Sequence, residues 1–362
     1  MPRSKPREKR AAAIARFVEP MKALAVADVP TGAWRTEIKF DGYRALAVLR
    51  AGKSELWSRN EKPLTADYPE VVAALRGVRC KSAVLDGEIV ALDAEGRSRF
   101  QLLQQRGDAV GGRPPIHFYV FDLLQLNGES WMSSPIEERR TALEKLLGNS
   151  KGVVRLSPVF EIEPVLVLDE ARRQGLEGII VKQPGSLYEA GRRSGAWLKH
   201  RLSNEQEFVI GGFTPPRGGR RHFGAILVGY YAANGKLQYA GKVGAGFNGA
   251  LLASLHREFE KRRSEASPFE GLPRDRSRWG VGMTAAVMKT VAWVRPELVA
   301  QVRFSEWTED GLLRQPVFLG LRRDKPAREV VRETAPALHG KTRGKKNPSR
   351  KPAPQSNMSL IK

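Results

Sequence analysis

The strand and helix signals change character near Ser203, and this change constrains the fold more than any other feature of the chain. From about Trp34 to Arg201, short runs rich in β-branched and aromatic residues predict strands: "ALAVLR", "SELWS", "AVLDGEIVALD", "IHFYVFDLL" and "EGIIVK". Two runs with helical spacing predict helices, with Pro135 in the first turn of "PIEERRTALEKLL" and Gly175 as the C-cap of "PVLVLDEARRQGL". Because helices and strands do not alternate regularly, we expect a mixed α+β domain rather than a doubly wound parallel sheet.

After Ser203 the chain is dominated by closely spaced strand candidates with glycine turns between them: "EFVIGGF", "AILVGYY", "KLQYAGKVG", "AWVRPELVAQVRF" and "PVFLGL". One helix, "NGALLASLHREFEKRR", interrupts them. Five strands around one helix predict a small all-β barrel of the oligonucleotide-binding (OB) type. From about Glu333 onward the chain is basic, contains several prolines and has no periodic apolar pattern, which predicts disorder.

The length of 362 residues also argues for two domains. The expected division is a basic N-terminal extension (1–16), an α+β domain (17–203), a barrel domain (204–330) and a basic tail (331–362).

The charge balance points to an anionic partner. The chain has 61 Lys and Arg against 39 Asp and Glu, a formal charge of +22. Such an excess attracts polyanions and releases their counterions on binding. Nucleic acid is the first candidate, and an anionic membrane surface is the second, although no apolar run is long enough to span a bilayer. The start, "MPRSKPREKR", is not followed by an apolar signal core, so we expect a cytoplasmic protein.

Cysteine and histidine are scarce, which limits the metal chemistry. The single cysteine, Cys80, excludes an intrachain disulfide and a cysteine-built zinc site, and five scattered histidines show no ligand spacing. A bound metal is therefore expected to be a hard ion held by carboxylates.

The segment "EIKFDGYR" (37–44) places one lysine between two acids on an alternating stretch. Glu37, Lys39 and Asp41 share one side of an extended chain, and Gly42 then permits a sharp turn. Two interpretations follow from these residues alone. The segment is either a half-buried strand with an ion pair on its solvated face, or it holds a lysine whose amine acts as a nucleophile.

Further blocks follow in order: "SRN" (58–60) with Arg59, "LDGEIVALD" with Glu88, "FYVFDLL" with Phe121, "EGIIVK" (177–182), "WLKHR" (197–201) and "RRDK" (322–325). Together with "KFDGYR", these blocks resemble the motifs of ATP-dependent DNA ligases and of their capping-enzyme relatives. The wording "WVRPELVAQVRFSEWTEDGLLRQPVFLGLRRDK" most resembles the ligase module of bacterial non-homologous end-joining ligases, in which that module is often fused to a polymerase and a nuclease. The resemblance covers roughly residues 17–330, and it implies a nucleotidyltransferase (adenylation) domain followed by an OB-fold.

The resemblance also implies a role for each motif residue. Lys39 would attack the α-phosphate of ATP and form a lysyl-AMP phosphoramidate, and Phe121 would stack on adenine. Glu88 and Glu177 would hold a divalent metal, Mg²⁺ or Mn²⁺, and contact ribose. The remaining ATP or AMP contacts would come from Glu37, Arg44, Arg59, Lys182, Lys199 and Arg201. Arg322, Asp324 and Lys325 would orient pyrophosphate during the first step and then move away when the barrel grips DNA.

Each of these residues has a structural alternative. Glu88 could be a carboxylate paired with an arginine, Phe121 a core residue, and Lys182 and Lys199 solvated surface lysines. The motif "RRDK" could be a salt-bridged strand end. One departure from the family pattern is Arg201, where many ligases have a second lysine; its planar fork stays charged, which suits a phosphate clamp.

The resemblance implies an ATP-dependent DNA ligase that seals 5′-phosphate and 3′-hydroxyl breaks through lysyl-AMP and DNA-adenylate intermediates. The implied partners are duplex DNA with nicks or broken ends, a Ku-type end-binding protein and a repair polymerase, with a monomer acting near the bacterial nucleoid. The basic stretches 215–223 and 257–263 would add phosphate contacts, or they are solvated surface. Two alternatives remain open: an RNA-capping or RNA-ligating nucleotidyltransferase, and a non-catalytic nucleic-acid-binding relative.

Overall fold

The computed structural model describes residues 11–50, 52–104, 114–148, 152–216, 218–270, 272, 285–333 and 360. The chain forms two compact units. The first contains Met1–Arg99, Pro114–Leu202 and Ala335–Lys362, and the second contains Phe100–Arg113 and Ser203–Thr334. The helix α2 (Phe100–Gln104) thus groups with the second unit, whereas the sequence boundaries place it in the first domain.

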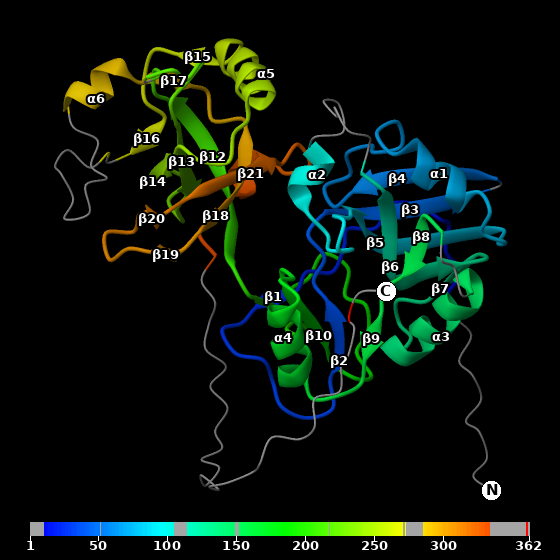
Figure 1. Cartoon of the computed structure of the whole chain (residues 1–362). Helices are drawn as coiled ribbons and strands as arrows, with labels where there is room; N and C mark the ends of the chain where they lie inside the picture. Colours follow the sequence, from blue (N-terminus) through cyan, green and yellow to red (C-terminus); the bar gives the residue numbers. More distant parts are fainter. Residues whose placement is uncertain are drawn as a thin grey trace, which may run out of the picture. The chain divides into compact units, whose positions relative to one another are not determined.

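The first unit is built on two sheets, whose strands are labelled in Figure 1 except for β11. One sheet has the order β4-β3-β5-β6-β7, with β8 also paired to β6. Its strands are β3 (Tyr43–Arg50), β4 (Lys53–Ser58), β5 (Ser82–Ala91), β6 (Ile116–Leu126), β7 (Glu129–Ser130) and β8 (Val154–Leu156). The other sheet has the order β1-β11-β10-β2-β9. Its strands are β1 (Leu24–Ala25), β2 (Arg35–Ile38), β9 (Val159–Phe160), β10 (Gly178–Lys182) and β11 (Trp197–Arg201).

Three helices pack on these sheets: α1 (Pro69–Leu75) on β4 and β6, α3 (Ile136–Leu147) on β6, and α4 (Pro164–Arg173) on β2 and β10. The predictions of α3 and α4 are confirmed. α4 begins with Pro164 in its first turn and ends at Arg173; Gln174 is the C-cap, and Gly175, whose φ of 65° lies in the left-handed region, follows it. The amides of Gly175 and Leu176 donate to the carbonyls of Arg172 and Ala171, which is the Schellman pattern that a C-cap glycine permits.

The second unit contains an eight-stranded sheet with the path β15-β17-β12-β13-β14-β16, to which β18 and β21 add through β12. Its strands are β12 (Asn204–Phe213), β13 (Ile226–Tyr231), β14 (Leu237–Val243), β15 (Arg263–Ser264), β16 (Phe269–Glu270), β17 (Ala292–Val294), β18 (Val299–Phe304) and β21 (Val317–Leu321). A separate two-stranded hairpin pairs β19 (Glu306–Trp307) with β20 (Leu313–Arg314), and two short helical segments are α6 (Ala285–Thr290) and η2 (Ala327–Glu329).

One strand prediction in this unit is wrong. The run "AWVRPELVAQVRF" was expected to be a single strand, but it forms β17 and β18 with residues 295–298 between them. Pro296 has no amide hydrogen to donate to a ladder, so it separates the two strands.

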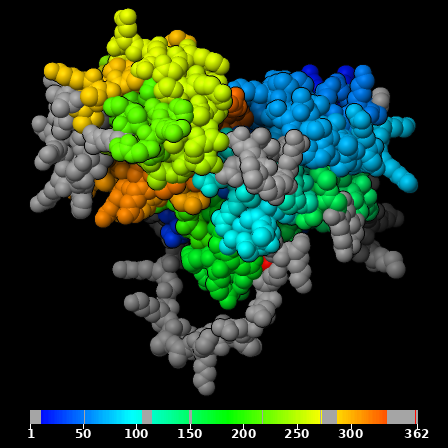
Figure 2. Space-filling view, turned by 45° about the horizontal axis from the view of Figure 1, so that its top comes forward, coloured from blue at the N-terminus to red at the C-terminus, as the bar shows by residue number. Residues whose placement is uncertain are grey.

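The predicted helix of the second unit is α5 (Gly249–Glu260), whose outer face lies at the surface in Figure 2. Asn248 caps it by accepting a hydrogen bond of 2.8 Å from the Leu251 amide. Leu252 and Phe259 face inward, and the Phe259 ring stacks on Phe213 of β12 with centroids 5.3 Å apart. This aromatic contact ties the helix to the core of the sheet. No helix in the described ranges of the chain is long and apolar enough to cross a bilayer.

Candidate active site

Lys39 follows the last residue of β2, in the first unit. Its amide donates to the Gly178 carbonyl at 2.9 Å, so the backbone of β10 fixes the start of the lysine side chain. Gly178 has φ +155°, and a Cβ there would lie 2.1 Å from the His200 carbonyl oxygen, so only glycine fits where three strands meet. As the alternation predicts, Ile38 is buried against the α4 side, while Glu37 and Lys39 belong to the other face.

The Lys39 amine forms an ion pair with Oε1 of Glu177, the residue directly before β10. The lysine side chain is 18% exposed and the glutamate side chain 6%. The Arg201 Nε atom lies 3.7 Å from the same carboxylate oxygen. The structure thus brings together Lys39, Glu177 and Arg201, which are separated by up to 162 positions in the sequence.

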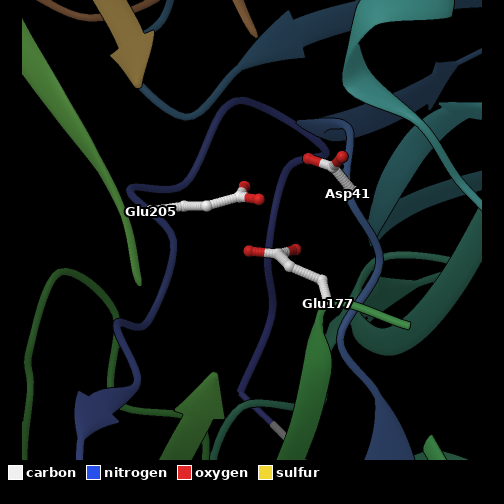
Figure 3. A group of neighbouring side chains, drawn as sticks. All are labelled: Asp41, Glu177 and Glu205. Carbon is white, nitrogen blue, oxygen red and sulfur yellow. The ribbon is translucent and has the colours of Figure 1, made fainter. Parts of the chain in front are cut away.

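A second carboxylate lies beside this pair. Oxygens of Asp41 and Glu177 are within 4.8 Å of each other, and Figure 3 shows both side chains; Glu205, also labelled there, belongs to the second unit. Glu177 Oε2 is buried and has no hydrogen-bond partner among the described residues. An orphaned buried carboxylate oxygen next to another acid suits a hard divalent cation. Asp41 was not assigned to a metal from the sequence.

Glu37 and Lys182 form the floor of the site. The Lys182 amine is 2.5 Å from Glu37 Oε1, and the Ser157 hydroxyl donates to Glu37 Oε2 at 2.7 Å. Lys182 is 1% exposed, so the alternative that it is a solvated surface lysine is wrong. Its amine also lies 4.7 Å from the ring centroid of Phe121 and 4.4 Å from that of Trp197. Through these cation–π contacts, the Lys182–Glu37 ion pair packs against two aromatic side chains, Phe121 and Trp197, which we call the aromatic wall.

The aromatic wall consists of Phe121 and Trp197, whose ring centroids are 6.1 Å apart in an edge-to-face arrangement. Phe121 is half-buried, whereas its strand neighbours Val120 and Asp122 are almost fully buried. The exposed part of its ring leaves a surface on which a flat base could stack. Trp197 was quoted within a motif but was not given a role from the sequence.

Arg44 is held in a closed set of hydrogen bonds. Its guanidinium donates to both carboxylate oxygens of Asp86, at 3.0 and 2.6 Å, and to the Met21 carbonyl at 2.7 Å. The Tyr188 hydroxyl donates to Asp86 Oδ2 at 2.6 Å and accepts from the Met21 amide at 3.0 Å. Burial opposes the charge of Arg44, but Asp86 outweighs it and holds the arginine pKa above its usual value. Burial and the Asp86 carboxylate raise the pKa of Tyr188 well above its usual value, so the phenol stays a donor.

Sequence reasoning missed Asp86, Tyr188 and Met21. For Asp86 a signal was available, because it lies two positions before Glu88 and therefore on the same face of β5. Met21 and Tyr188 come from loops, and only the tertiary fold brings them to Arg44.

Three further motif residues, Glu88, Arg59 and Lys199, are located by the strand registers. Glu88 is opposite Arg44 in the β3–β5 pairing, and Arg59 follows the last residue of β4, one position past Ser58, which pairs with Ala45. Lys199 is opposite Ile180, which is itself opposite Glu37, so the three form one row across the second sheet. All of these motif side chains are partly exposed except Glu37, which is buried.

The motif 322–325 belongs to the second unit. The Arg322 guanidinium donates to both oxygens of Asp324, each at 2.9 Å, and the Lys325 amine is 2.9 Å from Glu207 Oε2. The three motif residues are thus tied into ion pairs within their own unit, as the alternative of a salt-bridged strand end describes. A role toward pyrophosphate requires that these pairs open or turn toward the nucleotide.

Known protein families and relatives are similar to this chain over most of its length. The protein-family model for the ATP-dependent DNA ligase domain matches residues 14–201. The family model for the ATP-dependent DNA ligase C-terminal region matches residues 219–325. The multifunctional non-homologous end joining protein LigD of Pseudomonas aeruginosa is 38% identical over 340 residues, which are 92% of this chain and 39% of that protein. DNA ligase C1 of Mycolicibacterium smegmatis is 33% identical over 305 residues, 80% of this chain and 84% of that protein.

A solved structure of mycobacterial DNA ligase D complexed with ATP and MES is also similar, with 35% identity and a TM-score of 0.60 over 86% of this chain and 98% of that one. This similarity confirms the predicted architecture of an adenylation domain followed by an OB-fold domain. The chain spans about two fifths of the length of the LigD proteins it matches. The matches to both family models and to DNA ligase C1 show that the chain belongs to the family of ATP-dependent DNA ligases.

Proposed function

We propose that this chain is an ATP-dependent DNA ligase that uses Lys39 as its nucleophile. The observation that carries the proposal is the Lys39–Glu177 ion pair, in which the same Glu177 carboxylate also lies near Arg201 and Asp41. In the first step the Lys39 nitrogen forms a bond to the α-phosphorus of ATP, the bond to pyrophosphate breaks, and the amine gives up a proton.

In the second step the AMP group passes from Lys39 to a 5′-phosphate of DNA. In the third step a DNA 3′-hydroxyl attacks that phosphate, the phosphodiester forms and AMP leaves. Each step displaces a group from phosphorus, so charge neutralisation and alignment supply most of the catalysis.

The pairing with Glu177 bears directly on the first step. A free lysine has a pKa of about 10.4, so its nucleophilic neutral form is scarce at neutral pH. The Lys39 nitrogen is engaged in the ion pair with Glu177, so it must leave Glu177 before it attacks phosphorus. Asp41 and the orphaned Oε2 of Glu177 fit a hard cation, and a bound Mg²⁺ or Mn²⁺ would neutralise phosphate charge and compete with the ammonium for Glu177. Glu88 would provide a further contact to the metal ion and to the ribose.

The other residues bind and orient the nucleotide. Phe121 provides the stacking face for adenine, and Glu37 holds Lys182, whose amine lies against the Phe121 ring. Arg44, fixed by Asp86, faces the ribose and phosphate together with Arg59. Lys199 and Arg201 bind phosphate oxygens, and Arg322, Asp324 and Lys325 orient pyrophosphate.

We extend the proposal to the biological setting, in which this ligase would repair broken DNA ends in the bacterial cytoplasm, near the nucleoid. The relatives named LigD support end joining as the pathway, with a Ku-type protein and a repair polymerase as partners and a monomer as the acting form. The net charge of +22 supports binding of the DNA backbone. We also propose that the adenylation domain ends at about residue 203 and the OB-fold domain at about residue 330.

The test is transfer of label from α-³²P-ATP. The wild-type chain should become labelled with ATP but not with GTP, and a chase with 5′-phosphorylated nicked DNA should move the label to DNA and seal the nick. Lys39→Ala should abolish labelling, whereas Lys53→Ala, an exposed lysine on β4, should not. Labelling by GTP would favour the capping-enzyme alternative, and labelling without sealing of DNA would favour a different acceptor.

A further inference from the structure

The apolar cluster under α4 contains one residue from a distant part of the chain. Val26, Ile38, Ile179 and Leu198 line it from the sheet side, with Val167, Leu168 and Ala171 from α4. All of these residues lie between positions 26 and 198, but the cluster also includes Leu360, which is 3% exposed. The C-terminal end of the chain therefore contributes a buried side chain to the core of the first unit.

The composition of the tail independently singles out its last residues. Residues 334–357 contain histidine, six lysines and arginines, four prolines and no acidic residue. Three large apolar residues, Met358, Leu360 and Ile361, lie close together after this basic stretch. Burial of an apolar side chain is favourable because it removes apolar surface from water.

We infer that Leu360 is an anchor, whose side chain docks the C-terminal region into the apolar cluster formed by α4, β2 and β10, elements labelled in Figure 1. The occupant of this site is the chain's own end, and the ligand chemistry is a single aliphatic side chain. The proposal goes beyond ligation and does not depend on it.

The anchor changes what the basic stretch before it can do. That stretch follows Glu333, whose amide donates to the Gln206 side chain at 3.0 Å in the second unit. With Leu360 docked, the positive charge is fastened at both ends to folded protein instead of at one. A basic segment held at both ends stays closer to DNA bound by the protein than a segment held at one end does. Its effective concentration near that DNA is therefore higher.

Hydrogen–deuterium exchange of the full-length chain tests the anchor without any activity measurement. Burial of one leucine side chain raises the equilibrium constant for docking, the ratio of docked to undocked chains, by about tenfold to a hundredfold. Leu360→Asp should therefore speed exchange of the α4 amides, Val167, Leu168 and Ala171 included, by a factor of that order. Ser356→Asp adds the same charge outside the anchor and should leave α4 unchanged. Exchange in α5, in the other unit, serves as the internal reference.

A peptide rescue makes the result specific. A synthetic peptide of residues 351–362, added to the Leu360→Asp protein, should restore protection of α4 with an affinity on the order of millimolar, as expected for one aliphatic anchor. The same peptide with aspartate at the leucine position should not. Equal α4 exchange in wild type and Leu360→Asp would overturn the proposal. So would equal effects of the two peptides, since α4 protection would then arise from something other than leucine docking.

Discussion

The hydroxyl of Tyr188 donates a hydrogen bond to Asp86, and the same carboxylate holds Arg44 by two further bonds. Tyr188 lies 102 positions from Asp86, and its hydroxyl also accepts from the Met21 amide. One phenol thus fixes both the carboxylate that orients Arg44 and the loop that provides the second acceptor of that arginine.

Replacing this phenol tests whether the orientation of Arg44 matters. Tyr188→Phe should lower the free energy of unfolding by about 1–3 kcal/mol, because it leaves the buried Met21 amide and Asp86 oxygen each one partner short. It should also slow adenylylation of the enzyme by about tenfold at saturating ATP. The measurements are urea unfolding and single-turnover labelling with ATP.

The second unit offers a matched control for that change. The Tyr239 hydroxyl is buried without a hydrogen-bond partner among the described residues, so Tyr239→Phe should be neutral or slightly stabilising. If Tyr188→Phe behaves like Tyr239→Phe in both measurements, the hydrogen-bond circuit does not orient Arg44.

A second prediction concerns the buried ion pair between Lys182 and Glu37. Lys182→Met should destabilise the protein by about 3–5 kcal/mol, because the Glu37 carboxylate would lose its only charged partner in the described residues while staying buried. Adding Glu37→Gln in the same protein should recover part of that loss. A double-mutant cycle by chemical unfolding measures the coupling, and strictly additive effects would show that the pair is not coupled.

The same logic applies to Arg139, which is fully buried on α3. Its guanidinium holds Asp122 at 2.7 and 2.9 Å and donates to the carbonyls of Ser134 and Ser186. Arg139→Met should cost about 3–5 kcal/mol of unfolding free energy, whereas Arg172→Met, which breaks an exposed pair with Asp169, should cost less than about 1 kcal/mol. Similar losses in the two variants would contradict the structural assignment of Arg139.

Glu177 supplies a prediction about metal dependence. Glu177→Gln keeps the size of the side chain but removes a charge from the candidate cation site with Asp41. We expect the concentration of Mg²⁺ needed for half-maximal labelling of the protein to rise by at least about tenfold. Glu170→Gln on α4 is the control, and an unchanged Mg²⁺ titration for Glu177→Gln would exclude this glutamate from metal binding.

Much of the first unit could be predicted from sequence because its signals are local. The helices α3 and α4 follow from apolar spacing with proline at their starts, and the alternation of "EIKFDG" correctly separates Ile38 from Glu37 and Lys39. The meeting of Lys39, Glu177 and Arg201 came from family resemblance, since no local rule brings distant strands together.

The missed features are those that depend on tertiary contacts. Tyr188 and Met21 reach Arg44 from loops, and Leu360 reaches the α4 cluster from the end of the chain. The split of β17 from β18 was in principle readable, because Pro296 interrupts an otherwise continuous apolar run. Most residues of the tail expected to be disordered lie outside the described part of the structure, which includes only residues 331–333 and Leu360 of it.

The central claim is tested most directly by intact-mass spectrometry of the purified chain after incubation with Mg²⁺ and ATP, followed by peptide mapping. The account predicts one added adenylyl group, located on the peptide that contains Lys39 and released by pyrophosphate. A chain that never gains this mass, or that carries it on another residue while Lys39→Ala still becomes labelled, would contradict the account.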